Sequence, residues 1–163
     1  MPIRLEPARP EDFPAVAALL EKNKLPVDGL RECFSTAVVA CERDQMVGSA
    51  AVELYGPAAL LRSVAVEERL RNRGLGRTLA KAALDLARRH QAVTAYLLTE
   101  TAPDFFSRFF GFQPIARVDV AAVVQQSIEF KTACPDTAKA MVLSLLALEE
   151  TPITLRASEK AAV

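Results

Sequence analysis

Apolar and polar positions in the first two thirds of the chain alternate in a way that predicts short strands around two helices. Apolar residues that alternate or run together between turn residues indicate strands at residues 3–6, 35–42, 46–54, 59–66 and 92–99. The run at 59–66 is apolar on both faces, which is typical of a central strand. Apolar residues that recur every three or four positions predict helices at residues 10–24 and from residue 75 onward.

The last third of the chain continues this mixed pattern. It predicts four further elements, a short helix at 102–110 that ends at Gly111, a strand at 112–117, a helix at 119–131 and a strand at 138–146. Residues 149–163 show little periodicity and are expected to form a loose tail. The strand at 59–66, the helix behind it and the strand at 92–99 predict a parallel βαβ unit. We therefore expect a single α+β domain over residues 1–148.

Composition and charge narrow the classes of protein that this domain can represent. The 163 residues suit one domain, and 51% of them are hydrophobic. The 20 basic and 20 acidic side chains leave no net charge, which argues against general nucleic-acid binding. Three cysteines without a C-x-x-C pair, and a single histidine, predict no metal site. The sequence shows no secretory signal and no apolar run long enough to cross a bilayer, so we expect a cytoplasmic protein without a membrane partner.

The segment RNRGLGRTL, residues 71–79, is basic and rich in glycine, and it opens the helix that follows the strand at 59–66. Such a turn presents free backbone N–H groups and the positive end of the helix dipole, which favours a phosphate. A Walker loop does not fit because the segment has no lysine, and a dinucleotide fingerprint does not fit because Leu79 stands where its third glycine should be. A plain glycine turn is the alternative for this segment taken alone.

The spacing of Arg71, Gly74 and Gly76 is R-x-x-G-x-G, between an apolar strand and a helix. In this setting the segment resembles the acyl-CoA-binding motif of the GNAT family of acyltransferases, although the proline that usually precedes the loop is absent. The later segment DFFSRFFGF resembles the family pattern A-x-x-F-Y-x-x-x-G-F, and the resemblance covers roughly residues 3–116. It implies a mixed central sheet of about six to seven strands, helices on both faces, and a splay between the fourth and fifth strands.

The resemblance also implies acetyl-CoA as the acyl donor. The pantetheine arm would pair with main-chain groups of the first splayed strand, at Ser63, Val64, Ala65 and Val66. The pyrophosphate would lie on the backbone amides of the loop, at Arg71, Asn72, Arg73, Gly74, Leu75, Gly76, Arg77 and Thr78. The arginines would strengthen the local positive field, and the Thr78 hydroxyl could add a donor.

The candidate catalytic residues are Glu53, Glu100 and Ser107. The family acid is usually a tyrosine four residues before the glycine of GF, where this chain has Ser107, while counting forward from FF selects Phe106 instead. Ser107 is therefore a candidate proton relay or a solvated helix serine. Glu53, on an apolar strand, and Glu100, past the end of a parallel strand, are candidate general bases. A surface glutamate and a loop charge are the respective alternatives.

Two further residues are candidate substrate contacts. Arg62 interrupts the apolar strand at 59–66, where a charge is costly unless it is paired or functional. Arg62 could bind a substrate carboxylate through two parallel bonds, or it could pair with Glu53 on the neighbouring strand. Tyr55 could line the acceptor side or fill the core.

Three segments, LLRSVAV, LLTETAPDFF and IEFKTACPDTAKAM, together resemble amino-acid acetyltransferases of the N-acetylglutamate synthase type. They look closer still to small GNAT proteins associated with arsenic-resistance operons, through Glu129, Phe130, Cys134, Pro135, Thr137, Ala138 and Met141. This resemblance implies a small acidic or amino-acid-like amine as acceptor, with an organoarsenical as one candidate. Because such folds often dimerise, a second copy of the chain is a candidate partner.

Two functions from different classes follow. The first is an N-acetyltransferase that moves the acetyl group of acetyl-CoA to a small amine by direct attack in a ternary complex. The second is a GNAT-fold module that binds acyl-CoA without catalysis, as a sensor or partner domain, and the missing tyrosine favours it. We expect the enzyme, because positioning alone can support transfer from a thioester.

Overall fold

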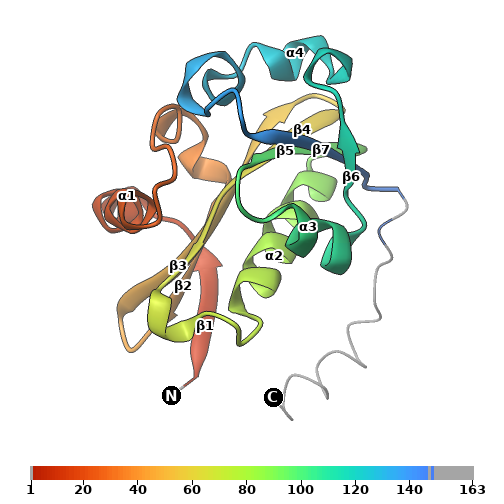
Figure 1. Ribbon diagram of the computed structural model, residues 1–163. Helices are drawn as coiled ribbons and strands as arrows, with labels where there is room; N and C mark the ends of the chain where they lie inside the picture. Colours follow the sequence, from red (N-terminus) through yellow and green to blue (C-terminus); the bar gives the residue numbers. More distant parts are fainter. Residues whose placement is uncertain (1, 147, 149–163) are drawn as a thin grey trace.

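A seven-stranded mixed sheet with the strand order β1-β2-β3-β4-β5-β7-β6 forms the centre of the computed structural model, which describes residues 2–146 and 148 (Figure 1). The strands are β1 (Ile3–Pro7), β2 (Ala37–Glu42), β3 (Gln45–Tyr55), β4 (Ala58–Val66), β5 (Thr94–Thr99), β6 (Gln113–Ile115) and β7 (Lys139–Ser144). The helices are α1 (Phe13–Lys22), α2 (Leu75–Arg89), α3 (Pro103–Phe110) and α4 (Ala122–Gln125). Short turns of helix are η1 (Pro10–Asp12), η2 (Arg31–Thr36), η3 (Glu68–Leu70), η4 (Arg117–Asp119) and the π-helical η5 (Glu129–Ala133). The α+β fold is confirmed.

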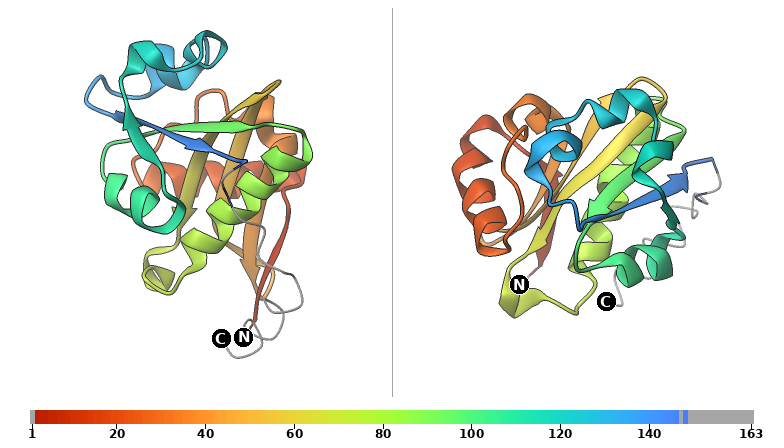
Figure 2. Two further views of the ribbon diagram at one scale, coloured as in Figure 1. Left: turned by 90° about the vertical axis from the view of Figure 1, so that its right-hand side faces the viewer. Right: turned by 45° about the horizontal axis from the view of Figure 1, so that its top comes forward.

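Helices cover both faces of the sheet, as expected (Figure 2). The apolar stripe of α2 packs on one face, where Leu79 and Ala83 are fully buried. Helix α1 and η2 cover the opposite face around Leu20 and Leu30. Gly48 on β3 permits the close approach of α2, because a Cβ there would lie 2.7 Å from Leu79 Cδ1. The buried core thus lies on both sides of the central strands.

The segment between β6 and β7 differs from the single helix predicted at residues 119–131. It forms η4, the one-turn helix α4 and the separate π-helical turn η5. Between α4 and η5, the Ser127 hydroxyl accepts a hydrogen bond from the Phe130 amide at 3.3 Å. The break lets Glu129 point into the protein, where its side chain is 5% exposed.

Other differences from the predicted elements are small. Strand β2 begins at Ala37, later than predicted, because Ser35 and Thr36 belong to η2. Strand β6 is shorter than the strand predicted at 112–117. The tail predicted at 149–163 lies outside the described residues. Among the helices that are described, none is both long and apolar enough to cross a membrane.

The parallel strands β4 and β5 separate soon after they pair. Ala58, Ala59 and Leu60 pair with residues 94–96, whereas β4 continues to Val66. Among the described residues, the remaining part of β4, residues 61–66, therefore has no strand partner on its β5 side. This confirms the splay expected between the fourth and fifth strands.

A bulge in β4 lies at the start of the splay. The register of β3 with β4 shifts so that Ser63 and Val64 together face Ala50. Ser63 has a φ of +59°, a left-handed conformation that is costly for a residue with a side chain. The Ser49 hydroxyl holds this conformation by donating to the Ser63 carbonyl at 2.8 Å. The bulge redirects the main chain of β4 where the sheet opens.

Candidate functional site

The start of helix α2 presents backbone N–H groups that no acceptor in the helix satisfies. Gly74, which precedes the helix, has a φ of +85°, and among the described residues no side chain caps the helix. The N–H groups of Leu75, Gly76 and Arg77 therefore lack an intrahelical acceptor and point out of the first turn. The exposed residues of the preceding loop are Arg71, Asn72, Arg73 and Gly74. Free N–H groups and the helix dipole together favour an anion here.

The two glycines and Thr78 shape this loop in different ways. At Gly74 the left-handed backbone conformation favours glycine. Space is not the reason, because an added Cβ would have no described atom within 4 Å. Gly76 is not needed by the internal packing, because an added Cβ would make ordinary contacts with Val66 at 3.6 Å and Phe105 at 3.9 Å. A glycine at such a position favours close approach of a ligand to the backbone. The Thr78 hydroxyl donates to the Gly74 carbonyl at 3.0 Å and so supports the helix start.

Two arginines of the loop already have partners in the protein. Arg71 donates to the Val66 carbonyl at 3.3 Å and to Asn23 Oδ1 at 2.6 Å. The Arg77 guanidinium lies 4.8 Å from the centre of the Phe109 ring. These contacts hold the Arg71 and Arg77 side chains beside the loop.

Beyond the splay, the free edge of β4 carries main-chain groups that β5 does not pair. The Glu67 amide donates to the Val47 carbonyl of β3 at 2.9 Å. Because bonded pairs alternate along an antiparallel ladder, Ala65 bonds to β3, whereas the main-chain groups of Val64 and Val66 point toward the splay. Of the predicted pantetheine set, this edge therefore offers the main-chain groups of Val64 and the N–H of Val66, because the Val66 carbonyl accepts a hydrogen bond from Arg71 at 3.3 Å.

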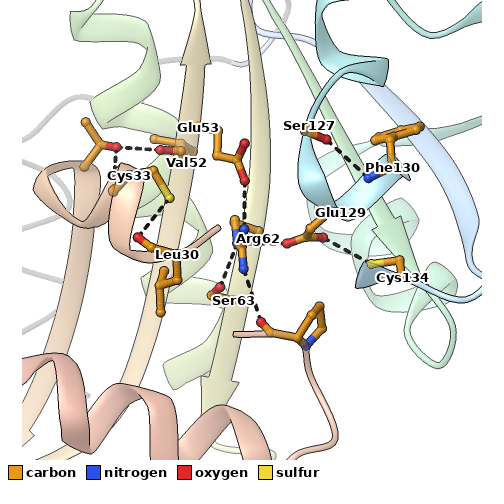
Figure 3. Close-up of polar contacts among 12 residues, drawn as sticks. Leu30, Cys33, Val52, Glu53, Arg62, Ser63, Ser127, Glu129, Phe130 and Cys134 are labelled. Carbon is orange, nitrogen blue, oxygen red and sulfur yellow. Dashed lines mark hydrogen bonds and ion pairs between the residues drawn. The ribbon is translucent and has the colours of Figure 1, made fainter. Parts of the chain in front are cut away.

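Arg62 is the centre of a buried polar cluster on the face of the sheet opposite α2 (Figure 3). Its guanidinium forms ion pairs with Glu53 Oε2 and with Glu129 Oε2, each at 2.8 Å. It also donates to the Pro26 carbonyl at 3.2 Å and to the Ser63 hydroxyl at 3.1 Å. The side chain is 0% exposed, so every donor nitrogen of Arg62 is engaged inside the protein.

Tyr55 and Cys134 complete the Arg62 cluster. Tyr55, on the same face of β3 as Glu53, donates its hydroxyl to Glu53 Oε1. Cys134 donates its thiol to Glu129 Oε1 at 3.3 Å. Each carboxylate oxygen of Glu53 and Glu129 therefore has a partner within the cluster. Among the described residues, no group of three His, Cys, Asp or Glu side chains could hold a metal ion.

A protein-family model described as the acetyltransferase (GNAT) family matches residues 4–112. The matched range contains the splayed strands, the glycine loop and α3. The chain belongs to the GNAT acetyltransferase family. Membership confirms the expected enzyme class, an acyltransferase, and favours it over a non-catalytic module. No match was found among the curated proteins.

Solved structures share the GNAT fold of this chain. N-acetylglutamate synthase from Neisseria gonorrhoeae, complexed with coenzyme A and N-acetyl-glutamate, has a TM-score of 0.75 at 18% identity, with 89% of this chain and 35% of that chain covered. Rv2747 from Mycobacterium tuberculosis, in complex with CoA, has a TM-score of 0.72 at 25% identity, with 86% and 98% covered. Ard1 from Thermoplasma volcanium has a TM-score of 0.65 at 20% identity, with 87% and 95% covered. The chain spans about a third of the length of the synthase.

Burial and neighbouring charges shift the proton affinities of the Arg62 cluster in this GNAT domain. Burial raises the pKa of Glu129, and the charge of Arg62 partly offsets that rise. Burial and the bond to Glu53 raise the pKa of Tyr55. Burial and the charge of Glu129 raise the pKa of the Cys134 thiol to about 12. Tyr55 and Cys134 therefore stay protonated near neutral pH.

The other predicted catalytic residues lie outside this cluster. Glu100 directly follows β5 at an exposed position and accepts a hydrogen bond from the Thr137 hydroxyl at 2.8 Å. Ser107 is exposed on α3, and its hydroxyl has no hydrogen-bond partner in the part of the chain that the structure describes. The structure joins neither residue to the Arg62 cluster, and their catalytic roles stay predictions.

Glu129 is the residue of this cluster that sequence reasoning did not place there. The sequence named it only within the C-terminal resemblance, and not as a partner of Arg62. A signal was available, because Glu129 stands between Ile128 and Phe130, and a carboxylate in an apolar setting needs a partner when it is buried. The sequence did not indicate that Arg62 is the partner of Glu129.

Proposed function

We propose that the protein transfers the acetyl group of acetyl-CoA to the amine of a small molecule, by direct attack in a ternary complex. The observation that carries this proposal is the uncapped start of α2 at residues 74–76, together with the edge of β4 that the splay exposes. Two proteins of the same fold, the N. gonorrhoeae synthase and Rv2747, were solved with CoA, which supports the proposal.

In this proposal the pyrophosphate of CoA lies on the amides of Leu75, Gly76 and Arg77 and of the exposed loop before them. The amides of the pantetheine arm pair with Val64 and Val66, in the way that an extended peptide adds to a free strand edge. The reacting thioester then lies in the splay. The loop arginines contribute positive field around the phosphates.

Transfer requires a neutral amine at the thioester carbonyl, a donor for the oxyanion and departure of the thiolate. We place the oxyanion at the β4 bulge, where the Val64 N–H points into the splay. A thiol with a reference pKa of about 8.5 can leave as the thiolate without an acid. Both oxygens of Glu53 accept bonds from the protein, which favours a role in holding Arg62. Glu100→Gln and Ser107→Ala then test the remaining candidate base and relay by their effect on kcat.

We expect the acceptor to be a small, amino-acid-like amine, and an organoarsenical amine is a candidate from the sequence resemblance. Because the donors of Arg62 are engaged inside the protein, we do not propose it as the anchor of a substrate carboxylate. The proposed setting is the cytoplasm, without nucleic acid or membrane as a partner, and a second copy of the chain is a candidate partner.

Release of CoA thiol from acetyl-CoA, across a panel of amino acids, amino-acid amides, polyamines and aminoaryl arsonates, tests the proposed activity. No release with any amine would refute it. Gly74→Asp tests the proposed CoA site, because its carboxylate would meet the pyrophosphate. We expect calorimetry to show acetyl-CoA affinity reduced by about tenfold or more.

Gly56→Asp is the matched control for Gly74→Asp. Gly56 also has a left-handed φ, of +64°, with nothing within 4 Å of an added Cβ. It lies in the turn between β3 and β4, at the opposite end of β4 from the glycine loop. The two variants therefore share backbone strain and added charge, and only Gly74→Asp should lose affinity. Equal affinities in the two variants would refute the site.

A further inference from the structure

Arg62 joins two segments that are far apart in the sequence. The first is the α1–β2 loop, residues 23–36, in which the Pro26 carbonyl accepts a hydrogen bond from Arg62 Nη2 at 3.2 Å. The second is the β6–β7 segment, residues 116–138, in which Glu129 pairs with Arg62 Nε at 2.8 Å. Figure 3 shows the arginine side chain between these two segments. One buried side chain of β4 thus holds both.

The α1–β2 loop and the β6–β7 segment also touch each other beside Arg62. At Gly29, which has a φ of +81°, an added Cβ would lie 3.1 Å from Arg62 Nη1 and 3.5 Å from Ile128 Cβ. The loop backbone therefore passes close to the guanidinium, and the left-handed φ of Gly29 favours glycine there. The loop, the Arg62 guanidinium and Ile128 of the β6–β7 segment thus lie close together at this point.

Arg62 is also connected to the bulge of β4. It precedes Ser63, and its Nε lies 3.1 Å from the Ser63 hydroxyl, while Ser49 holds the Ser63 carbonyl at 2.8 Å. The next residue, Val64, turns its main chain toward the splay. The same guanidinium therefore contacts the α1–β2 loop, the β6–β7 segment and the bulge.

We propose that Arg62 and Glu129 form a clamp that holds the α1–β2 loop and the β6–β7 segment against the β4 bulge and so positions the acceptor amine. The inference rests on the proposed function, in which CoA lies on the α2 side of the splay and the amine approaches from the opposite face. Glu129 is a positioning residue that acts through Arg62. A small displacement of either segment moves the amine relative to the thioester carbonyl, and transfer is sensitive to that distance.

The shape of the guanidinium matters to this clamp. Arg62 directs separate nitrogens to Glu53, to Glu129 and to Pro26. A lysine ammonium carries its three donors on one nitrogen, so it cannot reach three acceptors that the guanidinium meets from three separate nitrogens. The clamp therefore predicts that Arg62→Lys fails to replace arginine although it keeps the charge.

Hydrogen–deuterium exchange tests the mechanical part of the clamp without any substrate. Glu129→Gln removes one charge from the β6–β7 segment and leaves Arg62 paired with Glu53. We expect about fivefold or faster amide exchange in the β6–β7 segment and also in the α1–β2 loop, with β2 unchanged. The matched control is Asp85→Asn, which removes a carboxylate paired with Lys81 at 2.6 Å on α2. Faster exchange confined to the β6–β7 segment, or no change, would overturn the clamp.

Steady-state kinetics test its role in positioning. With the best amine of the panel as acceptor, Glu129→Gln and Arg62→Lys should lower kcat/KM for the amine about fivefold or more and leave the acetyl-CoA affinity within about twofold of wild type. An unchanged kcat/KM for the amine, or full function in Arg62→Lys, would overturn the positioning role. If the wild-type protein acetylates none of the amines, the proposed function is refuted. The hydrogen–deuterium exchange experiment then decides by itself whether Arg62 and Glu129 hold the two segments together.

Discussion

Replacing Arg62 with methionine should destabilise the protein strongly and make its stability depend on pH. Methionine keeps most of the side-chain volume but removes both ion pairs of the buried cluster. Glu53 and Glu129 then each lose a partner that lies at 2.8 Å in the native protein. The Pro26 carbonyl loses its donor as well. Two buried carboxylates would face each other with no cation between them.

The expected loss follows from this geometry. Removing one partner of a buried ion pair costs about 3–5 kcal/mol, against a total stability of about 5–15 kcal/mol for a typical protein. Burial already raises the pKa of Glu129, and Arg62 opposes that rise, so the pKa rises further without Arg62. A carboxyl whose pKa is raised on folding contributes most stability below its unfolded pKa and loses it as pH rises through the folded pKa. Between the unfolded and the folded pKa of the carboxyl, the free energy of unfolding of the variant should therefore fall by about 1.4 kcal/mol for each pH unit and each proton involved.

Urea unfolding followed by circular dichroism at pH 5 and at pH 8 measures both effects. We expect Arg62→Met to be much less stable than wild type at pH 8 and to recover part of the loss at pH 5. Arg69→Met is the control, because Arg69 is an exposed partner of Glu42 and its loss should change stability little at either pH. A loss below about 1 kcal/mol, equal at both pH values, would refute the view that the cluster is a buried charge network.

Two further predictions test packing and thiol chemistry. Gly48→Ala should lower the free energy of unfolding by about 1–3 kcal/mol, because the added Cβ would lie 2.7 Å from Leu79 Cδ1 and 3.2 Å from the Ala65 carbonyl. Thermal unfolding measures this loss. An unchanged melting temperature would show that α2 can shift to accommodate the methyl group. The pKa of Cys134 is raised to about 12, so its thiol should react slowly with a disulfide reagent at pH 8. The charge of Glu129 contributes to this raised pKa, so Glu129→Gln should make the reaction of Cys134 faster. Peptide mass analysis measures the rate at which Cys134 is labelled. Equal rates in wild type and in Glu129→Gln would show that the charge of Glu129 does not raise the pKa of Cys134.

Local sequence was sufficient to predict the glycine loop and the central βαβ unit. The left-handed conformation of Gly74 and the free N–H groups at the start of α2 are properties of consecutive residues, so the R-x-x-G-x-G spacing indicates them directly. The apolar runs of β3 and β4 also predict strands directly, because both faces of these strands are largely buried, whereas β5 alternates between buried and half-buried residues. The splay was implied by the family resemblance and is visible in the short β4–β5 ladder.

The helix predicted at residues 119–131 shows where a local pattern was insufficient. Val120 and Val124 follow a helical spacing and are buried, but Ile128 at the next position of that series is 40% exposed. Glu129 turns inward instead, because its partner Arg62 lies in the interior. A contact with a distant strand thus overrides the local preference for one continuous helix.

The partners of Arg62 were decided only by the tertiary structure. From the sequence, Arg62 could bind a substrate carboxylate or pair with Glu53, and Glu129 was not considered as its partner. In the folded protein, β3 brings Glu53 and the β6–β7 segment brings Glu129 to the same guanidinium. The stability of a buried charge depends on which groups share its low-dielectric surroundings, and those groups come from segments that only the folded sheet brings together.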